Sequence, residues 1–286
     1  MILVTGCNPL SLRLVDAMGE GVARGACDKE CPEIPRGYLP YDPLSEESVA
    51  RLVEGQKPSL LVLAEEIENV EYCEQHRRDA MEFNTRAVRF FADAARKAEA
   101  RVVYRSTALV FDGRKPGGLY TETDKVNPIN VYGETKLMGE VHVDKVPEFL
   151  IVRMGEVYGP SPDNFVGQVG RQLKAGEKVE LARDMFFSPV LIDDAARVIR
   201  TLADNRMTGW FNVAGPERVS HYEFGRRIAA AFGADESLIV PVSASELGMT
   251  VPMPQDTSLS IAKLSMLINV RGIDEGLAAM KPAMEK

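Results

Sequence analysis

Short apolar runs alternate with helix-like segments through the first half of the chain. This periodicity predicts strands over residues 2–5, 21–27, 59–64 and 101–105, and helices over 9–18, 46–54 and 74–98. Strict alternation of strand and helix implies right-handed crossovers and a parallel sheet with helices on both faces. We therefore expect an α/β, Rossmann-like doubly wound fold, in which ligands bind beyond the carboxyl ends of the strands.

The second half of the chain indicates a smaller lobe. Its pattern predicts strands over 149–153 and 209–215, helices beginning after Asn164 and near residue 192, and a helix capped by Ser220 that runs to Phe232. We expect one domain over residues 1–155 and a second over 156–286, with residues from about 190 to 215 returning to the first sheet. Residues 28–43 contain four prolines and are expected to form a surface loop.

Tyr132 and Lys136 are the first candidates for chemistry, because they stand four residues apart in a helix-forming segment shortly after Thr107. On a helix this spacing places both side chains on one face. A lysine cation within about 4–6 Å can lower the pKa of a tyrosine from about 10 by one to three units. Tyr132 is then expected to act as general acid or base, while Thr107 binds the same substrate oxygen. The chain has 8 tyrosines, so a purely structural pair stays open as an alternative.

A longer pattern surrounds this pair: Ser106-Thr107, then Val110-Phe111-Asp112-Gly113, Tyr120-Thr121-Glu122, Asn127-Pro128 and Asn130-Val131-Tyr132-Gly133-Glu134-Thr135-Lys136. In this order the chain resembles the extended short-chain dehydrogenase/reductase superfamily, and within it the dTDP-4-dehydrorhamnose reductase branch, which includes the regulatory β subunit of methionine adenosyltransferase. The resemblance implies a dinucleotide-binding domain over 1–155 and a substrate-binding lobe over 156–286. It also implies that Thr107, Tyr132 and Lys136 form the catalytic set for hydride transfer at a sugar C4 position.

The same resemblance implies NAD or NADP as cofactor and a nucleotide sugar as substrate. The residues that it assigns to the cofactor are Gly6, Asn8, Leu10, Asp28, Ala64 and Lys136, and those that it assigns to the substrate are Ser106, Arg153 and Asn164. Asp28 follows Gly6 by about twenty residues, where an acidic side chain binds the adenosine ribose and favours NAD over NADP. A solvated aspartate in a loop is the alternative.

The chain departs from the family pattern at the first turn. Of the expected Gly-x-x-Gly-x-x-Gly only Gly6 is present, with Pro9 and Leu12 at the other two positions. Asn8 suits the N-cap and Pro9 the first helical position. Pro9 nevertheless removes an N–H group from the place where a pyrophosphate is held. Either the turn rearranges around Pro9 and still binds the cofactor, or binding is weakened.

Three further departures concern the neighbouring segments. Leu63-Ala64-Glu65-Glu66 replaces Asn-Ala-Ala, and we expect the two carboxylates to turn to solvent, away from a bound phosphate. Ala108-Leu109 replaces Asp-Tyr, and Met253 replaces a phosphate-binding arginine. The sequence predicts an NAD(P)H-dependent reductase of a 4-keto nucleotide sugar. The alternative is a non-catalytic, regulatory nucleotide-binding protein.

Composition excludes several other classes. A formal charge of −8 without a basic stripe argues against a nucleic-acid partner, and the N-terminal apolar run is too short for a membrane span or signal peptide. We expect a cytoplasmic protein and, by resemblance, a homodimer. The four cysteines form no Cys-x-x-Cys pair and the three histidines are scattered, so free thiols and no metal site are expected.

Overall fold

The computed structural model describes residues 1–19 and 21–284, which form two compact units. The first unit contains Met1–Val110, Asn130–Arg153 and Ala196–Phe211, and the second contains Phe111–Ile129, Met154–Ala195 and Asn212–Lys286. The main sheet consists of β1 (Ile2–Thr5), β2 (Ala23–Asp28), β3 (Leu39–Tyr41), β4 (Leu60–Leu63), β5 (Arg101–Thr107), β6 (Phe149–Met154) and β11 (Gly209–Val213).

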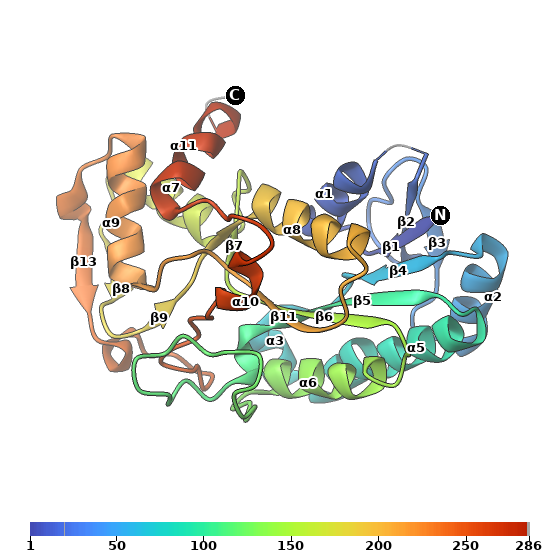
Figure 1. The fold of residues 1–286 in the computed structure, drawn as a ribbon. Coiled ribbons are helices and arrows are strands. Elements are labelled where there is room, and N and C mark those ends of the chain that lie inside the picture. Colours follow the sequence, from blue (N-terminus) through green and yellow to red (C-terminus); the bar gives the residue numbers. More distant parts are fainter. Residues whose placement is uncertain (20, 285–286) are drawn as a thin grey trace. The chain divides into compact units, whose positions relative to one another are not determined.

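Helices cover both faces of this sheet (Figure 1). They are α1 (Pro9–Met18), α2 (Glu46–Gln56), α3 (Val70–Gln75), α4 (Arg77–Met81), the π-helix η1 (Glu82–Ala87), α5 (Val88–Lys97), the 3-10 helix η2 (Ala108–Val110), α6 (Val131–Val143) and α8 (Ile192–Asp204). Helices α1 and α8 lie on one face, and α5 and α6 lie on the other (Figure 1). The expected α/β doubly wound fold is confirmed.

The strand order, β11-β6-β5-β4-β1-β2-β3, brings residues far apart in the sequence to one edge. Strands β1, β2, β4 and β5 pair in parallel, and their register places Thr5 beside Ala26 and Leu63, and Leu63 beside Tyr104. The segments that follow these residues therefore meet at the carboxyl edge, where a ligand is expected in such sheets.

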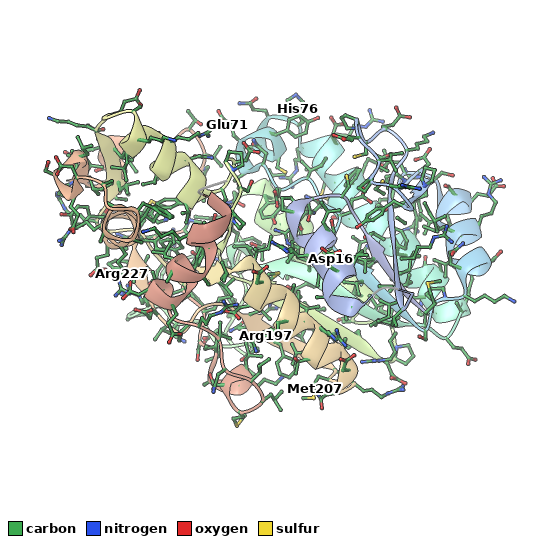
Figure 2. The ribbon with its side chains drawn as sticks, turned by 90° about the horizontal axis from the view of Figure 1, so that it is seen from above. Asp16, Glu71, His76, Arg197, Met207 and Arg227 are labelled. Atoms are coloured by element: carbon green, nitrogen blue, oxygen red, sulfur yellow. The ribbon has the colours of Figure 1, made fainter. Side chains whose placement is uncertain are left out.

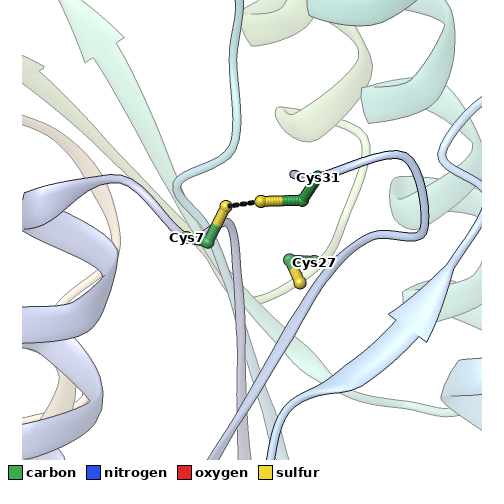
Figure 3. Close-up of side chains that lie close together, drawn as sticks. All are labelled: Cys7, Cys27 and Cys31. Atoms are coloured by element: carbon green, nitrogen blue, oxygen red, sulfur yellow. Dashed lines mark hydrogen bonds between the residues drawn. The ribbon is translucent and has the colours of Figure 1, made fainter. Parts of the chain in front are cut away.

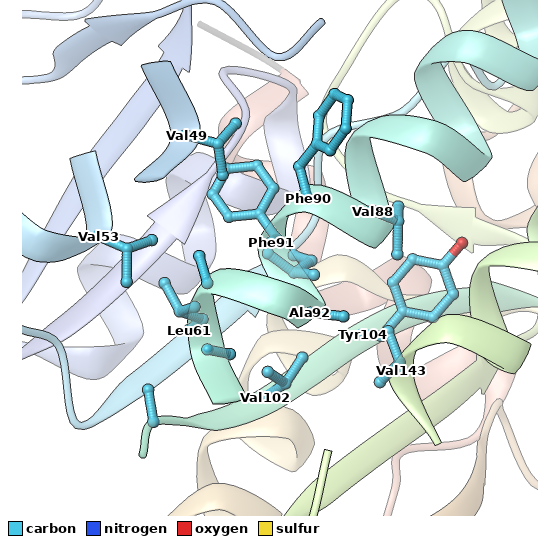
Figure 4. Close-up of a cluster of buried hydrophobic side chains, with 14 of the residues drawn as sticks. Val49, Val53, Leu61, Val88, Phe90, Phe91, Ala92, Val102, Tyr104 and Val143 are labelled. Carbon is cyan, nitrogen blue, oxygen red and sulfur yellow. The ribbon is translucent and has the colours of Figure 1, made fainter. Parts of the chain in front are cut away.

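A buried apolar layer holds β5 and α6 in place. Val49 and Val53 of α2, Phe91 of α5 and Val143 of α6 pack with Tyr104 of β5 (Figure 4). Each fully buried side chain of this size stabilises the fold by about 1.5–3 kcal/mol. Strand β5, which carries Thr107, and helix α6, which carries Tyr132 and Lys136, are thus held in place by buried packing.

The second unit has a core of its own, in which Tyr158, Phe187 and Phe224 pack with Leu277. Its short strands pair as β7 with β10, β9 with β12, and β8 with β13. Its elements are β7 (Val157–Tyr158), α7 (Phe165–Lys174), β8 (Val179–Ala182), β9 (Phe186–Phe187), β10 (Val190–Leu191), β12 (Val219–Ser220), α9 (His221–Phe232), η3 (Glu236–Leu238), β13 (Ile239–Val242), η4 (Ala244–Leu247), α10 (Ala262–Ser265) and α11 (Ile273–Met284). As expected, Ser220 caps α9.

Two predictions about secondary structure are wrong. The single helix expected over 74–98 is divided: α3 ends at Gln75, just before His76, which is labelled beside Glu71 in Figure 2, and a π-helix follows α4. In that π-helix, Asn84 turns inward and bonds both the N–H and the carbonyl of Ile67, at 2.8 and 3.0 Å. The loop expected over 28–43 contributes β3 to the sheet, where Pro40 is tolerated because β3 is an edge strand.

Over residues 1–19 and 21–284, no helix combines the length and the apolar character that a membrane crossing would need.

Candidate active site

Helix α6 presents Tyr132 and Lys136 as the spacing predicts. Asn130 caps the helix by accepting a hydrogen bond from the Gly133 N–H at 2.9 Å, and Glu74 accepts one from the Val131 N–H at 3.0 Å. The helix lies close to β5 because position 139 is glycine: a Cβ there would be 2.3 Å from the Tyr104 hydroxyl. Tyr132 and Lys136 are both buried.

The polar ends of these two side chains meet at a third residue, Glu66. The Lys136 Nζ lies 2.5 Å from Glu66 Oε2, and the Tyr132 hydroxyl donates to Glu66 Oε1 at 3.1 Å. Arg105, two residues before the end of β5, places Nη1 2.9 Å from the same Oε1. The side chains of Glu66 and Lys136 are each 1% exposed. One buried carboxylate thus accepts a hydrogen bond from Tyr132 and forms ion pairs with Lys136 and Arg105.

This arrangement corrects the expected tuning of Tyr132. Burial, and then the charge of Glu66, raises the pKa of Tyr132 well above its usual value of 10. Lys136 does not lower it, because the ammonium is paired with Glu66. Burial lowers the pKa of Lys136 itself, against the opposing effect of Glu66. Burial alone would raise the pKa of Glu66, but Arg105 and Lys136 hold it below its usual value, so Glu66 is ionised.

Thr107 closes β5 next to this group. Its hydroxyl accepts a hydrogen bond from the Leu109 N–H at 3.2 Å, and the side chain is 9% exposed. Leu109 packs against the buried cluster that contains Val131 and Tyr132. The segment that follows Thr107 thus packs against the start of α6, while a shared site and the role of Thr107 toward a substrate stay predictions.

The first turn is held by its own side chains. Gly6 has φ 101°, and a Cβ there would lie 3.1 Å from the Glu65 Cα, so only glycine fits. Asn8 caps α1 by accepting from the Ser11 N–H at 2.9 Å, and it donates to the Ala64 carbonyl at 2.8 Å. Pro9 occupies the first helical position, as expected, and Leu10 is buried.

The expectation that Glu65 and Glu66 turn to solvent is wrong, because both find partners inside. Glu65 accepts a hydrogen bond from the Asp28 N–H at 2.9 Å and another from the Tyr41 hydroxyl. Burial raises the pKa of Glu65 to about 7. The Asp28 carboxylate accepts a hydrogen bond from the Glu30 N–H at 3.0 Å, within the turn that follows β2.

Ser106 and Arg153 bind a different buried carboxylate, Glu140. Ser106 donates to Glu140 Oε1 at 2.6 Å, and Arg153 spans both oxygens, at 3.0 Å to Oε1 and 2.7 Å to Oε2. Trp210 adds a bond to Oε2 at 3.1 Å. This network accounts for their burial without a ligand, so the structure lends no support to the substrate contacts predicted for them.

Asn164 lies in the second unit, at the start of α7. Its side chain accepts a hydrogen bond from the Gly167 N–H at 3.0 Å and donates to the Gly159 carbonyl at 2.8 Å. It is thus a helix cap, and its contact with a substrate stays a prediction.

Three cysteines gather beside the first turn. The sulfur atoms of Cys7, Cys27 and Cys31 all lie within 4.8 Å of one another, and those of Cys7 and Cys31 are 2.6 Å apart (Figure 3). All are free thiols, as expected. Burial raises the pKa of Cys7 to about 12 and that of Cys27 to about 11. The sequence signal for this cluster is the spacing Cys27-x-x-x-Cys31, which falls within the range seen in zinc sites.

The carboxyl edge can be compared with the needs of a dinucleotide. Gly6, the Leu10 N–H group at the start of α1, and Asp28 at the end of β2 suit its phosphates and adenosine ribose. The ammonium of Lys136 and the hydroxyl of Tyr132 are groups that can bind the nicotinamide end of the cofactor. In this conformation both are bound to the Glu66 carboxylate instead. The residues therefore fit the cofactor once the Glu66 carboxylate moves.

Comparisons with known proteins agree with this architecture. The chain is 28% identical to the probable low-salt glycan biosynthesis reductase Agl14 of Haloferax volcanii, over 98% of this chain and 97% of the relative. It is 28% identical to methionine adenosyltransferase 2 subunit beta of Danio rerio, over 93% and 84%. The crystal structure of dTDP-4-dehydrorhamnose reductase from Bacillus anthracis in complex with NADP superposes with a TM-score of 0.85, at 25% identity over 98% of each chain. The RmlD substrate binding domain family matches residues 1–284, and the chain belongs to this family.

Proposed function

We propose that this protein is an NAD(P)H-dependent oxidoreductase that reduces the 4-keto group of a nucleotide sugar. The observation that carries the proposal is the convergence of Tyr132, Lys136 and Arg105 on the two oxygens of Glu66. Groups that bind one carboxylate together can also bind one small oxygen-bearing group of a ligand. Relatives that are named reductases of such sugars support the substrate class.

In this proposal Tyr132 donates its proton to the carbonyl oxygen of the sugar. The raised pKa of Tyr132 keeps the hydroxyl protonated at neutral pH, which is the state that a reduction consumes. Thr107 orients the same oxygen, and Lys136 holds positive charge beside it. When bound, the dinucleotide supplies the hydride. Glu66 stands where these ligands would make their contacts, so it leaves Tyr132 and Lys136 when they enter.

The test is turnover with dTDP-4-dehydrorhamnose and NADPH or NADH, followed by cofactor absorbance. Tyr132→Phe removes the proton donor and is expected to lower kcat by about 10²–10⁴-fold. Tyr222→Phe, on the partly buried face of α9, is the matched control and should retain activity. Equal activity in Tyr132→Phe and the unaltered protein would end the proposed role of Tyr132.

A second function is favoured by one observation. Glu66 forms buried ion pairs with Arg105 and Lys136 without any ligand. Such pairs are compatible with a protein in which Lys136 has no catalytic role. The protein would then bind a nucleotide, or a partner enzyme, without turnover, in keeping with the relative that is named as a subunit of methionine adenosyltransferase.

Thermal unfolding combined with the turnover assay separates the two functions. A dinucleotide at one hundred times its Kd stabilises the protein by about 2.7 kcal/mol. Stabilisation together with turnover of the sugar supports the reductase. Stabilisation without turnover of any 4-keto nucleotide sugar supports the non-catalytic function.

A further inference from the structure

The cysteine cluster belongs to no step of the proposed reduction. Its three members come from three segments at the carboxyl edge of the sheet: Cys7 follows β1, Cys27 lies in β2, and Cys31 follows in the loop (Figure 3). Strands β1 and β2 pair in parallel with Thr5 beside Ala26, so the next residues of both strands lie at the same level. The sheet thus places Gly6 beside Cys27, and Cys7 follows Gly6 at the same edge, in the turn between β1 and α1.

A tight turn brings in the third thiol. The Cys31 N–H donates to the Asp28 carbonyl at 2.9 Å, and the Glu30 N–H donates to the Asp28 side chain at 3.0 Å. Lys29 N–H is anchored to the Tyr41 carbonyl of β3 at 2.7 Å. Glu65 in turn accepts the Asp28 N–H. The backbone that carries Cys27 and Cys31 is therefore fixed on both sides.

We propose that Cys7, Cys27 and Cys31 form a binding site for a soft, thiophilic metal ion, namely Zn²⁺ held by three thiolates. Around a tetrahedral zinc with Zn–S bonds of about 2.3 Å, sulfur atoms lie about 3.8 Å apart, within the 4.8 Å limit of the cluster. Cys7 and Cys31 are at 2.6 Å and must separate by about 1 Å, which a rotation of the partly exposed Cys31 side chain provides. Each thiol gives its proton to solvent as its sulfur–metal bond forms.

The burial of the three residues gives the site a closed and an open side. Cys27 is fully buried, whereas Cys7 and Cys31 are partly exposed. A disulfide would use two of the sulfurs and leave the third without a function, whereas a metal ion uses all three. The fourth position of the ion is left for water or an exogenous ligand, on the side of the first turn. The proposal does not depend on the reductase function.

The experiment is a zinc titration of the reduced, metal-stripped full chain against a chromophoric chelator. One Zn²⁺ per chain is expected, and Co²⁺ in its place should give the charge-transfer absorption of thiolate ligands. Cys7→Ser, Cys27→Ser and Cys31→Ser should each weaken binding by about 100-fold or more, since loss even of an outer partner costs 10–100-fold. Cys73→Ser is the control, because Cys73 is a buried free thiol in a different cluster, and should bind zinc unchanged.

Cys27 is buried in a strand, so Cys27→Ser can fail to fold. Cys31→Ser, in the loop, keeps the test decisive, with circular dichroism as the check on folding. Stoichiometric zinc that is lost in Cys31→Ser but kept in Cys73→Ser supports the site. The proposal is overturned if the reduced chain binds no stoichiometric zinc, or if Cys73→Ser weakens binding as much as Cys31→Ser. It is also overturned if the cluster binds no metal and only loses two free thiols to a disulfide on air oxidation.

Discussion

Two buried glutamates in the first unit, Glu140 and Glu66, are each bound by an arginine and a hydroxyl group, yet they differ in how they are held. Glu140 receives a two-pronged contact from Arg153 and single bonds from Ser106 and Trp210. Glu66 receives one contact from each of three side chains. A bidentate pair is geometrically specific, whereas single contacts can be exchanged one at a time.

The residues that bind the two glutamates also differ in their further contacts and expected roles. Arg153 and Ser106 are buried and directed to Glu140. Arg105 also reaches the exposed Glu68 at 3.0 Å, and Tyr132 and Lys136 are the residues that the family pattern assigns to catalysis. The comparison teaches that burial of a carboxylate alone does not define its role. We infer that Glu140 is a fixed part of the fold and that Glu66 is a replaceable occupant of the site.

The largest expected effect is on stability, in Glu140→Ala. Removing this carboxylate breaks the buried, bidentate ion pair with Arg153, and breaking a buried pair by removing one partner typically costs about 3–5 kcal/mol. Urea unfolding should show the loss as a lower midpoint. Asp204→Ala, which breaks an exposed pair with Arg200, is the control and should cost less than about 0.5 kcal/mol. A loss below 1 kcal/mol for Glu140→Ala would mean that this network is not a fixed part of the fold.

A smaller effect is expected on ligand affinity, in Glu66→Gln. The amide keeps the shape of the side chain but releases the charge that holds Lys136, so NADPH should bind at least tenfold more tightly, or about 1.4 kcal/mol. Calorimetric titration measures this directly. Glu68→Gln is the matched control, because Glu68 shares Arg105 with Glu66 but is exposed, and its ion pair with Arg105 involves neither Tyr132 nor Lys136. Unchanged affinity in Glu66→Gln would make Glu66 equivalent to Glu140.

The smallest expected effect is a dependence of stability on acid pH. The pKa of Glu66 is lower in the folded protein than its usual value of 4.5. Its contribution to stability is therefore fully present above that value and is lost as the pH falls through the folded pKa. The free energy of unfolding should fall more steeply between pH 5 and pH 3, roughly, in the unaltered protein than in Glu66→Gln. Parallel curves would contradict the pairing of an ionised Glu66.

Sequence reasoning succeeded where the determinants are local. The Tyr132–Lys136 helix follows from a spacing of four, and the start of α1 follows from Asn8 and Pro9, which satisfy a cap and a first helical position. It failed where a partner comes from a distant segment. Glu66 is buried only because Arg105 and Lys136, far along the chain, reach it, and no pattern within residues 63–66 contains that information.

The position of β3 and the thiol cluster were missed for related reasons. Four prolines between residues 28 and 43 indicate a loop. An edge strand tolerates proline, because it pairs on one side only and fewer of its N–H groups donate hydrogen bonds to a neighbouring strand. Cys7 and Cys31 meet only through the turn at Asp28, which their separation of 24 positions does not encode. The spacing of Cys27 and Cys31 is the local signal that was available.

Gly139 sets the height of α6 above β5. A methyl group there would lie 2.3 Å from the hydroxyl oxygen of the fully buried Tyr104 and 3.1 Å from the Asn84 carbonyl oxygen, so the helix would have to move away from β5. Such a movement would carry Tyr132 and Lys136 with it, although the glycine touches neither a sugar nor a nucleotide. Because Gly139 follows Lys136 by three residues and Tyr132 by seven, it shares their face of α6, and its missing side chain sets the distance of both functional groups from β5.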